Sequence, residues 1–297
     1  MNPERLPRGA GKNGLNRIPG IKSAALQDYP LQSAACLTPR SDVVIIIIRQ
    51  NKLKQATSIH HELQERKKSG FQQYRFLTIG DKGLAFFLKY EIITSLFGNF
   101  PGALGFLFRR MFFNRLVKGA GKSIIWGKGI TLRHPHKIEV GNGAAVNDLV
   151  VLDAFGDEKS GIELGEQSLI SRNTVLNSKG GFIKIGKRTN IGTNSVIFSR
   201  DCTVSIGNDV LMAAFGYLMG GGDHSMERTD IPIVHQGAQC KGILIEDNVW
   251  LGAGVRVRDG IKIGRDSVIG TNSYVNSDIP PFSVAAGIPA KVLKKRV

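Results

Sequence analysis

The chain has few cysteines and no long apolar run, and each shortage excludes a class of protein. Its 297 residues include three cysteines, an odd number without C-x-x-C spacing. That excludes a disulfide framework and a cysteine zinc site, and it favours a reducing compartment. No stretch of roughly 18 apolar residues is free of charge, so no segment is expected to span a bilayer. The N-terminal "MNPERLPRGAGKNG" has no apolar stretch close behind its charges. We therefore expect no secretory signal and a cytoplasmic protein.

Acidic residues are also scarce, and the imbalance is concentrated in the first part of the chain. There are 40 Lys/Arg against 24 Asp/Glu, a net charge of +16. Residues 1–121 hold 19 Lys/Arg and 7 Asp/Glu, so +12 of the charge belongs to them and +4 to residues 122–297. Such a region favours an anionic partner, either membrane headgroups or nucleic acid. No recognised nucleic-acid-binding motif accompanies the charge, so nucleic acid is not expected.

The second part of the chain repeats the pattern apolar–x–apolar–small. The repeat appears in "KIEVG", "GIELG", "FIKIG", "TVSIG", "GILIE" and "GIKIG", and within each unit an aliphatic residue recurs every six positions. A period of six is neither helical nor strand-like; it is typical of short strands joined by tight turns, three to a coil, in a parallel β-helix. Six segments in the same phase argue against a β-sandwich with chance spacing.

The repeat predicts which side chains form the core. Residues 122–297 are expected to form the β-helix, with the second aliphatic of each segment stacked inside, coil on coil. These residues are Val140, Leu164, Ile185, Ile206, Ile245 and Ile263. Glycine and asparagine are expected at the corners, where a positive φ costs them little.

One interval in the repeat is too long for a coil. Ile206 and Ile245 are 39 positions apart, which leaves about 21 residues beyond one complete coil of 18. This insertion contains "GGGDHSMERTDIPIVHQG" (220–237) and is expected to leave the coil as an arm at about 219–241.

The N-terminal part divides into two regions. Residues 1–42 are rich in Pro, Gly, Arg and Ser and are predicted to be disordered, or to result from a start codon assigned too far upstream. Residues 43–121 are predicted to be helical and basic. The apolar, Phe-rich stretch 83–119 is interrupted at Gly98–Pro101–Gly102, which predicts two helices. They are expected either to bind an anionic membrane at its interface or to cap the open first coil, and the two alternatives are compatible.

The segments "GGGDHSMERTDIPI" and "KGILIEDNVWLGAGVRVRDGIKIGRDSVIGTNSYVNSDIPPFSVAAGIPAKVLKKR" resemble the hexapeptide-repeat acyltransferases. Among these the chain is similar to sugar and polysaccharide O-acetyltransferases of the galactoside and xenobiotic type. The resemblance implies a mainly β fold, a left-handed parallel β-helix here carrying an N-terminal α-helical extension. It also implies a homotrimer with active sites between subunits, and transfer of an acetyl group from acetyl-CoA to a sugar hydroxyl without a metal.

The histidines of the arm are the candidates for catalysis. A hydroxyl that attacks a thioester needs a proton acceptor with a pKa near working pH, which imidazole provides. His224 matches the family's Asp/Asn–His motif and is the predicted general base, while His235 is an alternative that no motif supports. Asp223 and Glu227 flank His224 and either orient it or are ordinary loop charges.

The resemblance also implies which residues bind the acyl donor. Trp250 either lines the cleft or packs at the subunit boundary, and the main chain near Ala253 and Thr271 is expected to meet the pantetheine arm. Asn276 and Ser277 stand where galactoside-type enzymes usually have Thr-Lys, so that lysine is missing here. The basic residues expected near the nucleotide phosphates are Lys291 and Lys294, with Lys295 and Arg296 beside them.

Two other functions are compatible with the repeat. A γ-type carbonic anhydrase needs three zinc-binding histidines with H-x₄-H in one coil, and this sequence has no such spacing. A non-catalytic scaffold held at a membrane by the basic helices is the other alternative, and the arm with His224 argues against it. His134 and His136 form an H-x-H that would place both rings on one face of a strand. We expect them to be a surface pair and not metal ligands.

Overall fold

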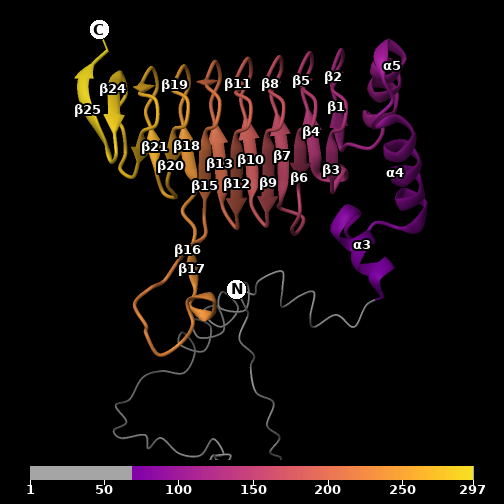
Figure 1. Ribbon diagram of the computed structural model, residues 1–297, viewed down its shortest axis with the longest axis horizontal. Coiled ribbons are helices and arrows are strands. Elements are labelled where there is room, and N and C mark those ends of the chain that lie inside the picture. Colours follow the sequence, from indigo (N-terminus) through magenta and orange to yellow (C-terminus); the bar gives the residue numbers. More distant parts are fainter. Residues whose placement is uncertain (1–68, 297) are drawn as a thin grey trace, which may run out of the picture. The chain divides into compact units, whose positions relative to one another are not determined.

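The short strands of the repeat stack into three parallel sheets. The computed structural model describes residues 69–296, so the disorder expected at 1–42 and the first part of the helical region expected at 43–121 lie outside the described residues. Seven consecutive coils each contribute one strand to the first, second and third sheet in turn (Figure 1). The predicted class, a left-handed parallel β-helix with an N-terminal helical extension, is confirmed.

The strands are short in all three sheets. The first sheet contains β1 (Gly119–Ala120), β4 (Ile138–Val140), β7 (Gly161–Leu164), β10 (Phe182–Ile185), β13 (Thr203–Ile206), β18 (Ile243–Ile245) and β21 (Lys262–Ile263). The second contains β2 (Ile125–Trp126), β5 (Ala145–Val146), β8 (Leu169–Ile170), β11 (Asn190–Ile191), β14 (Leu211–Met212), β19 (Trp250–Leu251), β22 (Val268–Ile269), β24 (Ser283–Gly287) and β25 (Ala290–Lys295). The third contains β3 (Thr131–Arg133), β6 (Val151–Asp153), β9 (Val175–Lys179), β12 (Val196–Arg200), β15 (Tyr217–Gly220), β20 (Arg256–Val257) and β23 (Tyr274–Val275).

The six residues predicted to form the core belong to the strands of the first sheet. Each is paired in register with the next, from Val140 against Leu164 to Ile245 against Ile263, and all six are buried. Ile206 pairs with Ile245 although 39 positions separate them, so the coil resumes its register after the insertion. The predicted stacking is confirmed.

The reason given for glycine at the corners holds at some positions, such as Gly143 at 65° and Gly254 at 70°, and fails at others. The positive φ is adopted by the residue at the turn itself, such as Asn194, Asn248 or Asn272, at 55–57°. A glycine such as Gly252 has no positive φ. A Cβ added there would lie 2.7 Å from the Thr271 amide nitrogen of the next coil. At positions like Gly252 glycine is therefore required by the close approach of neighbouring coils, while asparagine or another glycine supplies the left-handed turn.

Three helices cover the open first coil. They are α3 (Gly70–Ile79), α4 (Leu84–Phe97) and α5 (Gly102–Phe113), and the expected break falls between α4 and α5. The Tyr90 hydroxyl donates to the Leu132 carbonyl at 2.8 Å, and Phe113 packs edge-on against the buried Trp126 ring. The inner sides of α4 and α5 thus cap the coil. None of the helices formed by residues 69–296 has the length and apolarity needed to cross a bilayer.

Arg109 joins the cap to the first coil. Its guanidinium is almost completely buried and donates to the Trp126 carbonyl at 3.0 Å and to the Phe100 carbonyl at 2.7 Å. A buried cation is tolerated only when such acceptors replace water. Its neighbour Arg110 is exposed.

The insertion leaves the coil after β15 and returns at β18. Its root is a two-stranded antiparallel ribbon of β16 (Asp223–His224) and β17 (Ala238–Gln239), and its outer loop carries the short helix η2 (Ile233–His235). Figure 1 shows it projecting from the side of the coil.

We expect Arg109→Ala to lower the free energy of unfolding by about 2–4 kcal/mol, because the buried Trp126 carbonyl and the partly buried Phe100 carbonyl lose a charged donor. Arg110→Ala is the matched control and should change it by less than about 0.5 kcal/mol. Denaturant unfolding of both variants measures the difference. Equal, small effects would show that the cap does not depend on the buried arginine.

Candidate active site

The root of the arm is held by one carboxylate. Asp259, which is 9% exposed, accepts the Gly221 amide at 2.7 Å and the Lys241 and Gly242 amides at 2.8 Å. Both ends of the arm are therefore tied to the same side chain. The sequence analysis missed Asp259, because "RDG" carries no signal beyond a turn.

Glycine is required where the arm begins. Gly221 has φ +80°, and a Cβ there would collide with the Arg200 carbonyl. The glycine run before His224 is thus explained by a left-handed backbone and by close contact with the neighbouring coil.

His224 lies in the ribbon, directly beyond this root. Its main chain pairs with Ala238, and the following amide of Ser225 donates to the Gly237 carbonyl at 2.9 Å. The side chain is half-buried. Its Nδ1 atom is shielded from solvent and has no hydrogen-bond partner within residues 69–296. A shielded imidazole nitrogen without a partner is free to interact with a bound molecule.

The outer part of the arm is organised by Gln236 and not by the second histidine. The buried Gln236 amide donates to the Arg228 carbonyl at 2.6 Å and to the Ile231 carbonyl at 3.2 Å. His235 is exposed at the end of η2, and Glu227 is exposed as well. Gln236 was also missed, because glutamine in a polar loop is unremarkable in a sequence.

The predicted donor residues on the second sheet share one outward row. Trp250 pairs with Val268, Val268 with Val284, and Val284 with Lys294, so Trp250 and Lys294 lie on the same face. Trp250 is 51% exposed, whereas the next residue, Leu251, is buried. We call Trp250, Val268, Val284 and Lys294 the outer row. It is apolar at the tryptophan and positively charged at its far end, where Lys291 is also exposed.

The remaining donor candidates lie at corners. Ala253 and Thr271 occupy the same corner of adjacent coils, where the amide of Asn272 donates to the Ala253 carbonyl at 2.7 Å. Asn276 and Ser277 follow β23 and are exposed at a different corner, between the third and first sheets.

A single chain places His224 on a different side of the coil from Trp250 and Lys294, although Asn276 and Ser277 lie at the corner from which the arm leaves. The arm with His224 leaves after a strand of the third sheet and returns to the first. Trp250 and Lys294 belong to the second sheet.

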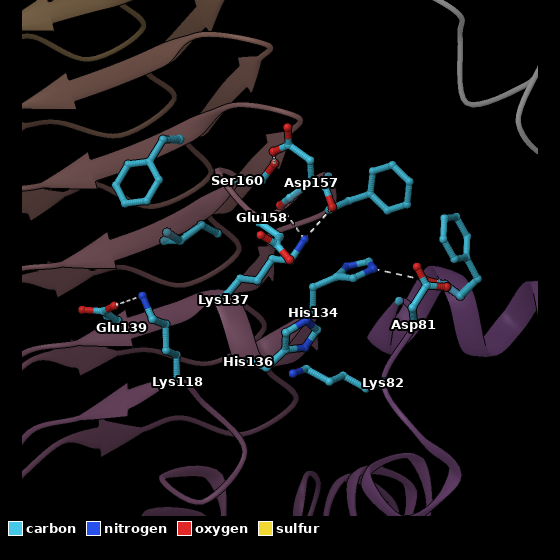
Figure 2. Close-up of a pocket in the computed structure, with 16 residues that line it drawn as sticks. Asp81, Lys82, Lys118, His134, His136, Lys137, Glu139, Asp157, Glu158 and Ser160 are labelled. Carbon is cyan, nitrogen blue, oxygen red and sulfur yellow. Dashed lines mark hydrogen bonds and ion pairs between the residues drawn. The ribbon is translucent and has the colours of Figure 1, made fainter. Parts of the chain in front are cut away.

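A pocket of about 510 Å³ lies elsewhere, between the loop after α3 and the first coils (Figure 2). Its walls include His134, His136 and Lys137 around the short helix η1 (Pro135–Lys137). The arm leaves from the fifth coil, so this pocket is separate from the predicted site. The pocket contains none of the residues expected to bind the donor or to act as base, so the arm is the candidate active site.

The expectation of a surface histidine pair is wrong. His134 is only 2% exposed, and its Nε2 lies 3.1 Å from the Phe76 carbonyl. The two rings flank the start of η1 and do not share one face of a strand. Burial and nearby Lys82 lower the pKa of His136 to about 4, so this ring is neutral. No group of three or more potential metal ligands occurs within residues 69–296.

The repeats match known families. The model of the bacterial transferase hexapeptide (six repeats) matches residues 242–277, and that of the hexapeptide repeat of succinyl-transferase matches residues 182–214. A galactoside O-acetyltransferase from Escherichia coli is 36% identical over 127 residues, 41% of this chain and 58% of that protein. The chain thus contains hexapeptide repeats of the kind found in bacterial transferases, and it is similar to a sugar O-acetyltransferase built from them.

Two further acetyltransferases are similar over a comparable length. A polysialic acid O-acetyltransferase from Escherichia coli is 32% identical over 126 residues, 42% of this chain and 40% of that protein. A probable acetyltransferase from Mycobacterium tuberculosis is 33% identical over 139 residues, 47% of this chain and 46% of that protein. This hexapeptide-repeat chain therefore spans about half the length of the curated relatives it matches.

We expect Asp259→Ala to loosen the arm, because three amides lose their common acceptor. Hydrogen exchange at Gly221, Lys241 and Gly242 should become at least about tenfold faster. Asp247→Ala removes an exposed carboxylate that accepts the Asn208 amide at 2.7 Å, and it is the control that should leave the arm unchanged. Unchanged exchange in Asp259→Ala would mean that the ribbon holds itself together.

Proposed function

We propose that this protein is an acetyl-CoA-dependent O-acetyltransferase that modifies a hydroxyl of a sugar or of a cell-envelope polysaccharide precursor. The observation that carries the proposal is the arm, which interrupts a regular coil. It holds His224 directly beyond the residues that Asp259 binds at both ends of the arm. The relatives named as galactoside and polysialic acid O-acetyltransferases support a carbohydrate acceptor. We further propose that the protein works in the cytoplasm, where the free thiols of Cys202 and Cys240 remain reduced.

The outer row fits the chemistry of the acyl donor. Acetyl-CoA, when bound, supplies an acetyl group activated as a thioester. Exposed Trp250 and the half-buried Val268 offer apolar surface for the pantetheine chain, and Lys291 and Lys294 offer positive charge for the phosphates. Ala253 and Thr271, at the adjacent corner, would contact the same chain through their main-chain groups.

His224 acts as the general base in this proposal. Neutral imidazole has one nitrogen that accepts a proton. His224 takes the proton of the acceptor hydroxyl as the hydroxyl oxygen bonds to the thioester carbonyl carbon. The carbon–sulfur bond then breaks, and His224 returns the proton to the departing sulfur, so the imidazole ends neutral. Transfer is direct, with donor and acceptor bound together.

We propose that a second copy of the chain completes each site within a homotrimer. Two exposed apolar surfaces support this assembly. One is the outer row, which continues beyond Trp250 to Leu211, 46% exposed. The other is the arm tip, where Met226, Ile233 and Val234 are exposed. Exposed apolar surfaces are typical of protein–protein interfaces. An arm that reaches a neighbour would bring His224 to the neighbour's outer row.

His224→Ala should lower kcat by at least about 10² and leave acetyl-CoA affinity nearly unchanged, because a base acts on the acceptor proton and not on the donor. His235→Ala is the matched control from the same arm and should have little effect. The effect on kcat is measured by steady-state kinetics with labelled acetyl-CoA and a panel of sugar acceptors. The effect on donor affinity is measured separately, by direct binding of acetyl-CoA. If His235→Ala causes the loss instead, the wrong histidine has been assigned.

A further inference from the structure

The cap has a second side that packing on the coil does not use. Its inner side is buried, through residues such as Phe87, Tyr90 and Phe113. Seven further apolar residues of these helices face away from the coil, and each is between 46 and 59% exposed. They are Leu84, Leu88, Ile92 and Leu96 of α4 and Leu104, Leu107 and Met111 of α5. We call these seven residues the outer cap face.

An apolar face of this kind is unusual for a helix at a protein surface. A surface helix normally buries one stripe and is polar on the other side, whereas a helix that is apolar all round is buried in protein or lipid. The capping role accounts for the inner side of α4 and α5 only. The outer cap face therefore requires a partner of its own.

The charges beside the outer cap face are positive. Lys89 and Arg110 are exposed on the same two helices, and Arg115 lies over the Phe112 ring at 5.4 Å. The acidic residue of α4 is Glu91, which accepts the Tyr74 hydroxyl of α3 at 2.8 Å, and α5 has none. A partner should therefore have an apolar interior that side chains can enter and negative charge at its surface.

The two helices present this face as one unit. The Phe97 ring of α4 is stacked on the Phe112 ring of α5, with centroids 4.4 Å apart, and it also contacts Phe108 at 5.1 Å. Arg109 fixes α5 to the first coil. The outer cap face is thus already ordered on the protein, so little conformational entropy would be lost on docking.

We propose that the outer cap face docks on an anionic lipid surface, with α4 and α5 lying in the headgroup boundary. Apolar side chains enter that boundary, while lysine and arginine at the edge attract anionic headgroups. A second copy of the chain fits less well. A two-fold contact would set this face against an identical one, so that both sides would carry the same positive charge. This inference goes beyond the proposed acetyl transfer and does not depend on it.

The test compares full-length variants on vesicles, so that the basic residues outside the described range contribute equally to each. The wild type should co-sediment with phosphatidylcholine vesicles that contain phosphatidylglycerol and not with phosphatidylcholine alone. Leu88→Gln with Ile92→Gln should weaken binding by at least about tenfold, because two apolar side chains no longer enter the boundary. Lys89→Gln with Arg110→Gln should weaken it by about fivefold for each charge at low salt, and less at high salt.

The control carries matched changes away from the cap. Arg172→Gln with Phe215→Gln removes an exposed cation and an exposed aromatic from corners in the middle of the coil, and it should bind like the wild type. Circular dichroism should be the same for all variants, since every altered side chain is exposed. The melting temperature should fall slightly only for Lys89→Gln with Arg110→Gln, because the Lys89 ammonium also donates to the Arg115 carbonyl at 2.6 Å. The proposal is overturned if the wild type ignores anionic vesicles, or if the outer-face and control variants bind equally. A change in oligomeric mass without a change in vesicle binding would assign the face to a second copy. Acetyl transfer to a soluble acceptor, measured in parallel, would separate these outcomes from failure of the proposed function.

Discussion

Each coil can bury its apolar row only against the coils above and below it, and the rest of the structure depends on this constraint. Ile206 must stack on Ile245 although an entire arm lies between them in the chain. The coils approach so closely that a Cβ at Gly252 would meet the main chain of the next coil. The first coil has no earlier neighbour, and α4 and α5 replace it with buried aromatic side chains.

The same constraint determines where chemistry is possible. The stacked coils form flat sheets, so functional groups can project only from the outward residues of strands, from corners and from an inserted arm. The donor candidates occupy the first two positions and His224 the third. The arm can leave without disturbing the stack because Asp259 binds the amides at both of its ends. Since one chain separates the arm from the outer row, the proposed site requires a second copy.

The sequence predicted those parts of the structure that follow from periodicity. The spacing of Leu164, Ile185 and Ile206 determines the register, and the 39-residue interval locates the arm, because both depend only on positions along the chain. Contacts between distant corners leave no periodic trace, which is why the roles of Asp259 and Gln236 were not foreseen. His134 was misjudged for a similar reason, since its burial depends on α3, a helix 58 positions away at Phe76.

The most direct test of a site shared between two chains is complementation of inactive subunits. His224→Ala lacks the base and Trp250→Ala lacks a donor contact, so each variant alone should have little activity. When the two are co-expressed in equal amounts, random mixing in a trimer pairs an intact arm with an intact outer row at about a quarter of the interfaces. The predicted result is therefore recovery of about a quarter of wild-type activity. Activity no greater than that of the two separate variants would contradict the shared site and place the base and donor residues in a single chain.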